Sequence, residues 1–201
     1  KVTVPGPEVL LQVWVTVTQG RQTLWHFLAV RPAASSGTNG SGIELRFVDY
    51  KGKRVLYRAH VPILNVKYDA NACGPYRDWR YQEGMIQAQG IDVAPGFRLY
   101  TAPALTILDT GSDTGNFLGV GIYVLGNEVV LVSEMEAGWY RYVSQWRLGT
   151  NGTIRPRFGF RHDVAENLGN QFLDVHIRTE VAESRHAVGR RKVPRVVRRP
   201  N

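Results

Sequence analysis

The sequence predicts an all-β protein, specifically an antiparallel β-sandwich, on three observations. Short apolar runs recur along the chain and are separated by turns that contain Gly, Asn or Ser. Several runs alternate apolar and polar residues with the period of two expected of a half-buried strand. No segment shows a helical period of useful length. Many short strands at roughly regular spacing are typical of an antiparallel sandwich.

The first third of the chain contains five expected strands. Two are followed by Gly-containing pairs, Gln19-Gly20 and Lys51-Gly52, which suit tight turns because Gly adopts positive φ freely. The next stretch, residues 69–103, is rich in Gly, Pro and aromatic residues and is expected to be irregular. The expected strands are residues 9–18, 23–30, 43–50, 54–58 and 61–68.

The second half contains a run of closely spaced strands, of which residues 139–148 alternate most strictly. Asn151-Gly152 follows this run, which predicts a hairpin with a type I′ turn. One face of the strand is expected to carry Tyr140, Tyr142, Ser144, Trp146 and Leu148, and the other Trp139, Arg141, Val143, Gln145 and Arg147. The other expected strands of this half are residues 106–108, 117–125, 129–136, 153–160 and 171–180.

The net charge of +8 is unevenly distributed. Seven of the 25 basic residues lie between Arg185 and Arg199, so the remaining 18 nearly balance the 17 acidic residues. We therefore divide the chain into a sandwich domain, residues 1–184, and a basic tail, residues 185–201. The tail is either a solvated extension or an electrostatic anchor for an anionic partner such as nucleic acid or a membrane surface. It contains no aromatic residue, so base stacking by the tail is not indicated.

Other features narrow the class of protein. Cys73 is the only cysteine, which excludes an internal disulfide and a zinc site built from paired cysteines. No apolar run approaches the ~20 residues that a transmembrane helix needs. Asn39-Gly-Ser and Asn151-Gly-Thr are glycosylation sequons, although both are also turn signals. The sequence leaves localisation open, with an extracellular location favoured.

Several stretches resemble, in order, the catalytic domain of copper amine oxidases. They include Trp25-His-Phe-Leu-Ala-Val30, Gly42-Ile-Glu-Leu-Arg-Phe-Val-Asp-Tyr50 and Arg54-Val-Leu-Tyr-Arg-Ala59. Gly138-Trp-Tyr-Arg-Tyr142, which enters the predicted hairpin, is similar to the strand in which that family oxidises a tyrosine to a quinone. The resemblance covers most of residues 24–180 and implies that the sandwich corresponds to the first half of that catalytic domain.

This resemblance implies an oxidase that deaminates primary amines with copper and a tyrosine-derived quinone. In that chemistry a copper ion held by imidazoles assists oxidation of the tyrosine by oxygen. The quinone carbonyl then reacts with the amine as a covalent electrophile. A buried carboxylate with a raised pKa removes the α-proton, and the products are an aldehyde, ammonia and peroxide.

The resemblance assigns the quinone precursor to Tyr140 and the catalytic base to Asp78. The family motif around the cofactor is Asn-Tyr-Asp/Glu, whereas Tyr140 is flanked by Trp139 and Arg141. A packed core tyrosine is the competing interpretation of Tyr140. Asp78 lies between Arg77 and Arg80, so an ion-paired loop residue is the competing interpretation there.

The copper ligands are where the sequence departs most from the family. The family supplies a His-x-His pair after the cofactor hairpin and a third histidine later, and this chain has no His-x-His. His162 is the nearest positional counterpart. The five histidines are His26, His60, His162, His176 and His186. We therefore expect the isolated chain to bind copper weakly or not at all and to form little or no quinone.

Three classes of function remain open at this stage. The first is a copper amine oxidase-like domain with a primary amine as substrate, either a minimal relative or one whose site is completed by another chain, for example in a homo-oligomer. The second is a degenerate, non-catalytic sandwich for binding or assembly, with the basic tail at Arg185–Arg199 contacting an anionic partner. The third is a nucleic-acid or anionic-surface binder that works through the basic tail itself.

Overall fold

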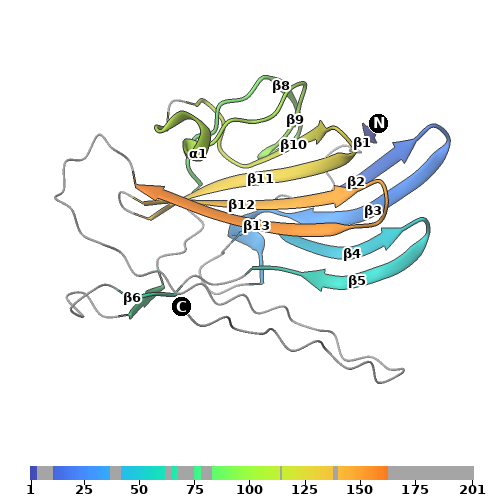
Figure 1. Cartoon of the computed structure of the whole chain (residues 1–201), viewed down its shortest axis with the longest axis horizontal. Helices are drawn as coiled ribbons and strands as arrows, with labels where there is room; N and C mark the ends of the chain where they lie inside the picture. Colours follow the sequence, from blue (N-terminus) through green and yellow to red (C-terminus); the bar gives the residue numbers. More distant parts are fainter. Residues whose placement is uncertain are drawn as a thin grey trace, which may run out of the picture.

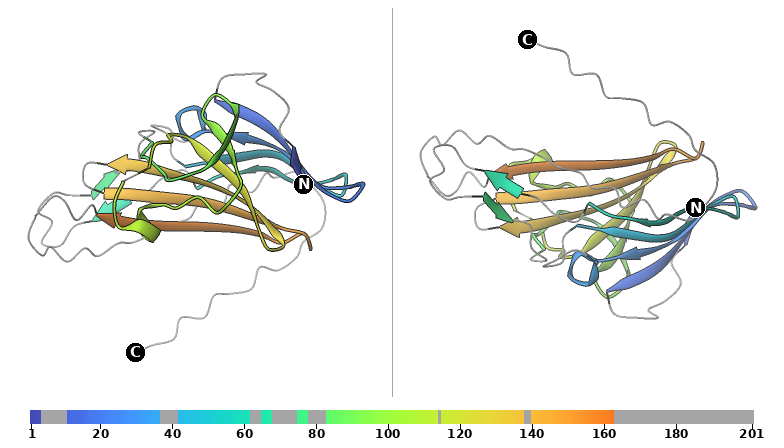
Figure 2. Two further views of the ribbon diagram at one scale, coloured as in Figure 1. Left: turned by 90° about the horizontal axis from the view of Figure 1, so that it is seen from above. Right: turned by 90° about the horizontal axis from the view of Figure 1, so that it is seen from below.

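The protein is a two-layer β-sandwich, and its described residues contain one turn of α-helix and one of 3-10 helix (Figure 1). The computed structural model describes residues 1–3, 11–36, 42–61, 65–67, 75–77, 83–113, 115–137 and 140–162. For residues 3, 65–67, 75–77, 137, 140 and 162 it describes the backbone only. Figure 2 shows the two sheets as separate layers, the blue and cyan strands in one and the yellow and orange strands in the other.

The first sheet is antiparallel throughout, with the strand order β1-β2-β3-β4-β5. Successive strands are neighbours, as expected of a chain folded through short hairpins. A 3-10 turn, Pro32–Ala34, follows β3. The strands are β1 (Val2–Thr3), β2 (Gln12–Gln19), β3 (Gln22–Val30), β4 (Glu44–Tyr50) and β5 (Lys53–Ala59).

The second sheet has the order β13-β12-β11-β10-β9-β8 and is antiparallel except between β9 and β10, which are parallel. The helix α1 (Ile107–Thr110) lies in the connection between these two strands. The strands are β8 (Gly90–Ala94), β9 (Phe97–Tyr100), β10 (Val120–Leu125), β11 (Glu128–Ala137), β12 (Tyr140–Gly149) and β13 (Ile154–His162). A separate ladder pairs β6 (Asn65–Lys67) with β7 (Pro75–Arg77).

The main core lies between the two sheets. Val15, Phe27 and Leu45 of the first sheet are fully buried there, together with Ile122 and Leu131 of the second. Two tryptophans link the layers by hydrogen bonds as well as by packing. The indole Nε1 of Trp25 donates to the carbonyl of Gly149 at 2.9 Å. The indole Nε1 of Trp146 donates to the carbonyl of Ile43 at 2.8 Å.

A second core covers the other face of the second sheet. The segment formed by residues 83–89 and 101–119, called here the covering segment, packs its Ile86, Ile107 and Phe117 against Val130 and Val132 of β11. Both faces of β11 and β12 are therefore buried over much of their length. Among the described residues, no helix is long and apolar enough to cross a membrane.

The structure confirms the all-β sandwich and most of the expected strands. The alternation of residues 139–148 is also confirmed: Trp146 and Leu148 contact the main core, and Val143 contacts the second core. Residues 69–103 were expected to be irregular, which is wrong, since they contain β7, β8 and β9. The expected strand at residues 106–108 is also wrong, because Ile107 begins α1. Residues 171–180 lie outside the described part.

The turn chemistry differs from the prediction in one place. A type I′ turn needs positive φ at both central residues. At Asn151-Gly152 only Gly152 has a positive φ, of 89°, and the Gly152 amide donates to the Gly149 carbonyl at 3.1 Å. The hairpin therefore closes through a three-residue loop with Gly at its last position. Lys51 and Gly52, with φ of 49° and 75°, make the type I′ turn instead.

Candidate functional site

The backbone brings the predicted cofactor residue, Tyr140, next to the predicted metal ligand, His162. Tyr140 is the first residue of β12 and His162 is the last residue of β13. The register of the two strands pairs them directly, Tyr140 with His162. Residues that face each other across antiparallel strands have Cα atoms about 4.5–5.5 Å apart. The side chains of Tyr140 and His162 lie outside the described part of the structure.

The side chains nearest this end of the hairpin, among those described, form an apolar and aromatic cluster. Tyr142 is 1% exposed and stacks on Phe158 with ring centroids 6.0 Å apart. Phe160 lies opposite Tyr142 in the register, and the centroids of their two rings are 6.5 Å apart. Met135, on the neighbouring strand, is fully buried and also pairs with Tyr142. On this face Tyr142 and Met135 are therefore shielded from solvent, whereas Phe160 is 36% exposed.

The other predicted residues are not brought into this site by the described structure. Asp78 lies outside the described residues, as do His176, His186 and the basic tail, residues 185–201. His26 lies in the first sheet, where its ring stacks on Trp14 at 4.8 Å and its Nδ1 is 3.0 Å from the Thr16 hydroxyl. His60 is buried next to Glu44, with 4.0 Å between its Nδ1 and the carboxylate. Within the described ranges, no group of three or more His, Cys, Asp or Glu residues is arranged to hold a metal ion.

A buried carboxyl cluster lies on the opposite face of the second sheet. Glu134 of β11 is fully buried, and its Oε2 accepts a hydrogen bond of 2.8 Å from the backbone N–H of Ile107. Asp113, from the covering segment, lies beside it and forms an ion pair with Arg141 of β12. Arg141 also reaches Glu136, 3.6 Å away. Neither Glu134 Oε1 nor Asp113 Oδ1 has a donor when both groups are ionised.

These surroundings keep a proton on Glu134. Burial is the main cause that raises the pKa of Glu134 to about 8, and the neighbouring Asp113 raises it further. The Ile107 amide and Arg141 act in the opposite direction but do not offset burial. A single proton shared between the two carboxyl groups gives both orphan oxygens a hydrogen-bond partner. Arg141 completes the cluster through its ion pair with Asp113.

The Glu134 cluster fixes the covering segment to the second sheet. The Gly84 amide donates to the Glu134 carbonyl at 2.7 Å. A Cβ on Gly84 would lie 3.1 Å from Glu134 Oε1, so only a glycine leaves full room for the carboxyl group. Together with the bond from Ile107, these contacts hold two parts of the covering segment against one strand. The carboxyl group is closed off from solvent, so in this conformation it acts as an anchor.

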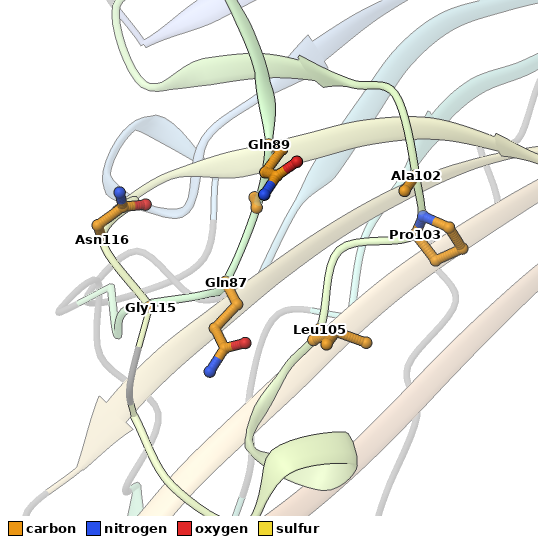
Figure 3. Close-up of a pocket in the computed structure, with 8 residues that line it drawn as sticks. Gln87, Gln89, Ala102, Pro103, Leu105, Gly115 and Asn116 are labelled. Atoms are coloured by element: carbon orange, nitrogen blue, oxygen red, sulfur yellow. The ribbon is translucent and has the colours of Figure 1, made fainter.

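A shallow groove of about 410 Å³ lies on the covering segment (Figure 3). The Gln87 and Gln89 side chains and Asn116 supply its amide groups, while Pro103 and Leu105 supply its apolar wall. It contains no titratable side chain, nucleophile or metal ligand. This groove can accommodate a small neutral molecule, but its residues supply no acid, base or nucleophile for a reaction.

The sequence contained a signal for Glu134 that was not used. Val130, Val132 and Glu134 alternate on one face of an expected strand, so the pattern places the carboxyl group beside buried valines. Asp113 gave no comparable signal, because its role depends on a contact with residues that are distant in the sequence.

No family model, curated protein or solved structure matches this chain.

Proposed function

We propose that this chain is a copper amine oxidase-like β-sandwich in which the Tyr140–His162 cross-strand pair forms one side of a copper–tyrosine site. The observation that carries the proposal is the register of β12 and β13. It sets the residue assigned as quinone precursor directly opposite the residue assigned as copper ligand. Both assignments rest on the same resemblance, and the proposal draws its support from the fact that the hairpin brings the two residues face to face.

The surroundings of the pair suit a redox-active tyrosine. Tyr142 and Met135 are buried on this face of the hairpin, and an apolar setting of this kind would limit the contact of a reactive carbonyl with water. In this proposal His162 would hold copper next to Tyr140. Copper with oxygen supplies the oxidation of the tyrosine, and the resulting quinone supplies the electrophile for a primary amine.

The described residues account for only one of the expected imidazoles. His26 and His60 both belong to the part of the chain that builds the first sheet and have partners there. A copper site at Tyr140 would therefore need His176, His186 or a residue of another chain to complete it. A copper site with a single imidazole from this hairpin would be weak, which is why we propose a degenerate relative and not a full oxidase.

The catalytic base of this proposal remains Asp78. Glu134 has the burial and the raised pKa that such a base requires, but it lies on the wrong face. The register places Glu134 opposite Val143 and Glu136 opposite Arg141, on the face that carries the odd-numbered residues of β12. Tyr142 belongs to the opposite face, where its ring stacks on that of Phe158. The sheet itself therefore separates Glu134 from the Tyr142 side.

Copper titration of the full chain tests this proposal. We expect weak Cu(II) binding, measured by calorimetry and by the copper electron paramagnetic resonance spectrum, that His162→Ala removes. His26→Ala is the matched control, since His26 lies in the first sheet, and it should leave copper binding unchanged. Copper binding that survives His162→Ala would reject the assignment, and binding lost in both variants would place the copper elsewhere.

A further inference from the structure

One surface of the first sheet carries a row of aromatic side chains across four strands. The row consists of Trp14 on β2, His26 on β3, Phe47 on β4 and Tyr57 on β5, and is called here the aromatic row. The Trp14 ring lies 4.8 Å from His26 and 6.2 Å from Phe47, nearly parallel to both. Tyr57 meets the Phe47 ring edge-on at 5.1 Å.

The aromatic row does not belong to the core. Val15, Phe27 and Val48, the chain neighbours of three members, are fully buried in the main core. The members themselves are half-buried, and Tyr57 is 52% exposed. Exposed aromatic rings that contact one another are preorganised for binding, since their positions are already fixed before a ligand arrives. The Tyr57 ring is therefore open to solvent on one side and contacts Phe47 on the other, and Phe47 in turn contacts Trp14.

The backbone at Phe47 supports a functional role for the row. Phe47 has a φ of 52°, in a region that a bulky side chain rarely adopts. It lies within an irregularity in the pairing of β4 with β3, and a second irregularity, between β4 and β5, follows at Val48 and Asp49. The irregularity with β3 places the Phe47 ring between Trp14 and Tyr57, where a regular strand would alternate it into the core. A strained residue held in a surface row is the kind of outlier that marks a binding site.

Positive charge surrounds the row. The Arg54 guanidinium lies 5.4 Å from the centre of the Phe47 ring and pairs with Asp49. Arg46 and Arg58 share one carboxylate, that of Glu44, so their pair of charges is only half neutralised. The three arginines beside the row thus share two carboxylates, which leaves a net positive charge on this surface. The surface therefore attracts an anionic partner.

We propose that β5 and the aromatic row bind a single-stranded nucleic acid. A base stacks on the exposed ring of Tyr57, and the phosphates lie along Arg54 and Arg58, both of which are exposed. Proteins that bind single strands combine exposed aromatic rings with a positively charged track. A duplex hides the faces of its bases, so the surface distinguishes the two forms. This inference is independent of the copper proposal, which concerns the other sheet.

The test uses the full chain and a fluorescent oligothymidylate at low salt. Tyr57→Ala and Tyr57→Leu are both expected to weaken binding about tenfold, while Tyr57→Phe retains it, because one stacked base is worth roughly 1–3 kcal/mol. Phe160→Ala is the matched control, an exposed aromatic residue of the other sheet. Arg54→Ala should lower the salt dependence by about one phosphate contact. Arg98→Ala is the control for this variant, because Arg98 also pairs with an aspartate and lies over a phenylalanine ring. Its removal should leave the salt dependence of binding unchanged.

Three results would overturn this inference. Equal binding by the wild type, Tyr57→Ala and Tyr57→Leu would mean that charge alone, including that of the basic tail, holds the oligonucleotide. Duplex of the same sequence, or heparin, bound as tightly as the single strand would mean a general affinity for polyanions. A change of oligomeric state in Tyr57→Ala, with unchanged oligonucleotide affinity, would mean that a second copy of the chain occupies the row. Circular dichroism of each variant confirms that it is folded.

Discussion

Glu134 is a buried carboxyl group whose pKa is raised to about 8, mainly by burial. A carboxylate placed on the valine face of β11 without compensation would cost several kcal/mol. The chain avoids that cost by keeping Glu134 protonated and by placing Asp113 and Arg141 beside it. Glu44, equally buried in the first sheet, is handled in the opposite way. Burial alone would raise its pKa, but hydrogen bonds from Arg46 and Ser36 hold the pKa of Glu44 below its usual value.

Glu134 predicts a specific dependence of stability on pH. The folded protein binds a proton at Glu134 up to about pH 8, whereas the unfolded chain releases it near the ordinary pKa of 4.5. The folded state therefore binds more protons between these values, and the free energy of unfolding falls as pH rises from about 4.5 to 8. Because each pKa unit corresponds to about 1.4 kcal/mol, the total is a few kcal/mol.

Urea unfolding of the wild type and of Glu134→Gln across this range measures the effect. Glutamine keeps the shape of the protonated acid, so the variant should lose the slope and exceed the wild type in stability at pH 8. Glu136→Gln, the half-buried carboxylate next along the same face, is the control and should keep the slope. A Glu134→Gln variant that still loses stability steadily up to pH 8 would show that another group is responsible.

Site residues were only partly predictable from the sequence, for physical reasons. Tyr140 and His162 were assigned by resemblance, and their pairing follows from hairpin closure, a local event. The Glu134–Asp113 contact depends on a covering segment that returns to the sheet through a parallel crossover. No local pattern encodes such a contact, since its residues are brought together only by the packing of the second core.

At the scale of elements, turns decide which strand predictions succeed. The β2–β3, β4–β5, β10–β11 and β12–β13 hairpins were predictable because alternation and a Gly-containing turn agree locally. The strands β8 and β9 were missed. Ile91 of β8 is exposed and Phe97 of β9 is buried, so these two strands lack a clean alternation of apolar and polar residues. The Pro95-Gly96 pair between them is typical of a loop. These short strands exist because β9 adds to the edge of β10, which is a tertiary effect.

Two glycines at hairpin tips give a matched comparison. Gly52 and Gly152 both have positive φ, but a Cβ on Gly52 meets nothing within 4 Å, while one on Gly152 meets the Tyr50 ring at 2.9 Å. Gly52→Ala should cost about 1 kcal/mol from backbone strain alone. Gly152→Ala should cost clearly more, because it also displaces the ring whose hydroxyl donates to the Thr150 carbonyl. Thermal unfolding of the two variants decides this; equal losses would show that the Tyr50 contact contributes nothing.

The two sheets are joined by buried indole hydrogen bonds as well as by apolar packing. Trp146→Phe should cost about 1–3 kcal/mol, since it leaves the buried Ile43 carbonyl without its donor. Trp14→Phe is the comparison, because Trp14 is only half-buried and lies outside both cores, and it should cost less. Chemical denaturation measures both. A larger loss for Trp14→Phe would mean that the aromatic row, and not the inter-sheet bond, carries the stability.

At the scale of the whole molecule, the sandwich and the basic tail are expected to be independent. The tail, residues 185–201, lies outside the described structure and carries like charges and two prolines, Pro194 and Pro200. Removal of the tail should leave the melting temperature nearly unchanged, because repelling charges and missing backbone donors disfavour packing. A fall of many degrees on deletion, seen by differential scanning calorimetry, would show that the tail is part of the fold.

The central claim is that this chain retains the hairpin of a copper–tyrosine site but not a complete set of copper ligands. The most direct measurement is the copper content and visible absorption spectrum of the full chain after incubation with Cu(II) and oxygen, with Tyr140→Phe as the reference. We predict weakly held copper and no visible quinone band beyond that of Tyr140→Phe. One tightly bound copper per chain, a visible band that Tyr140→Phe abolishes, and peroxide released from a primary amine would contradict the claim.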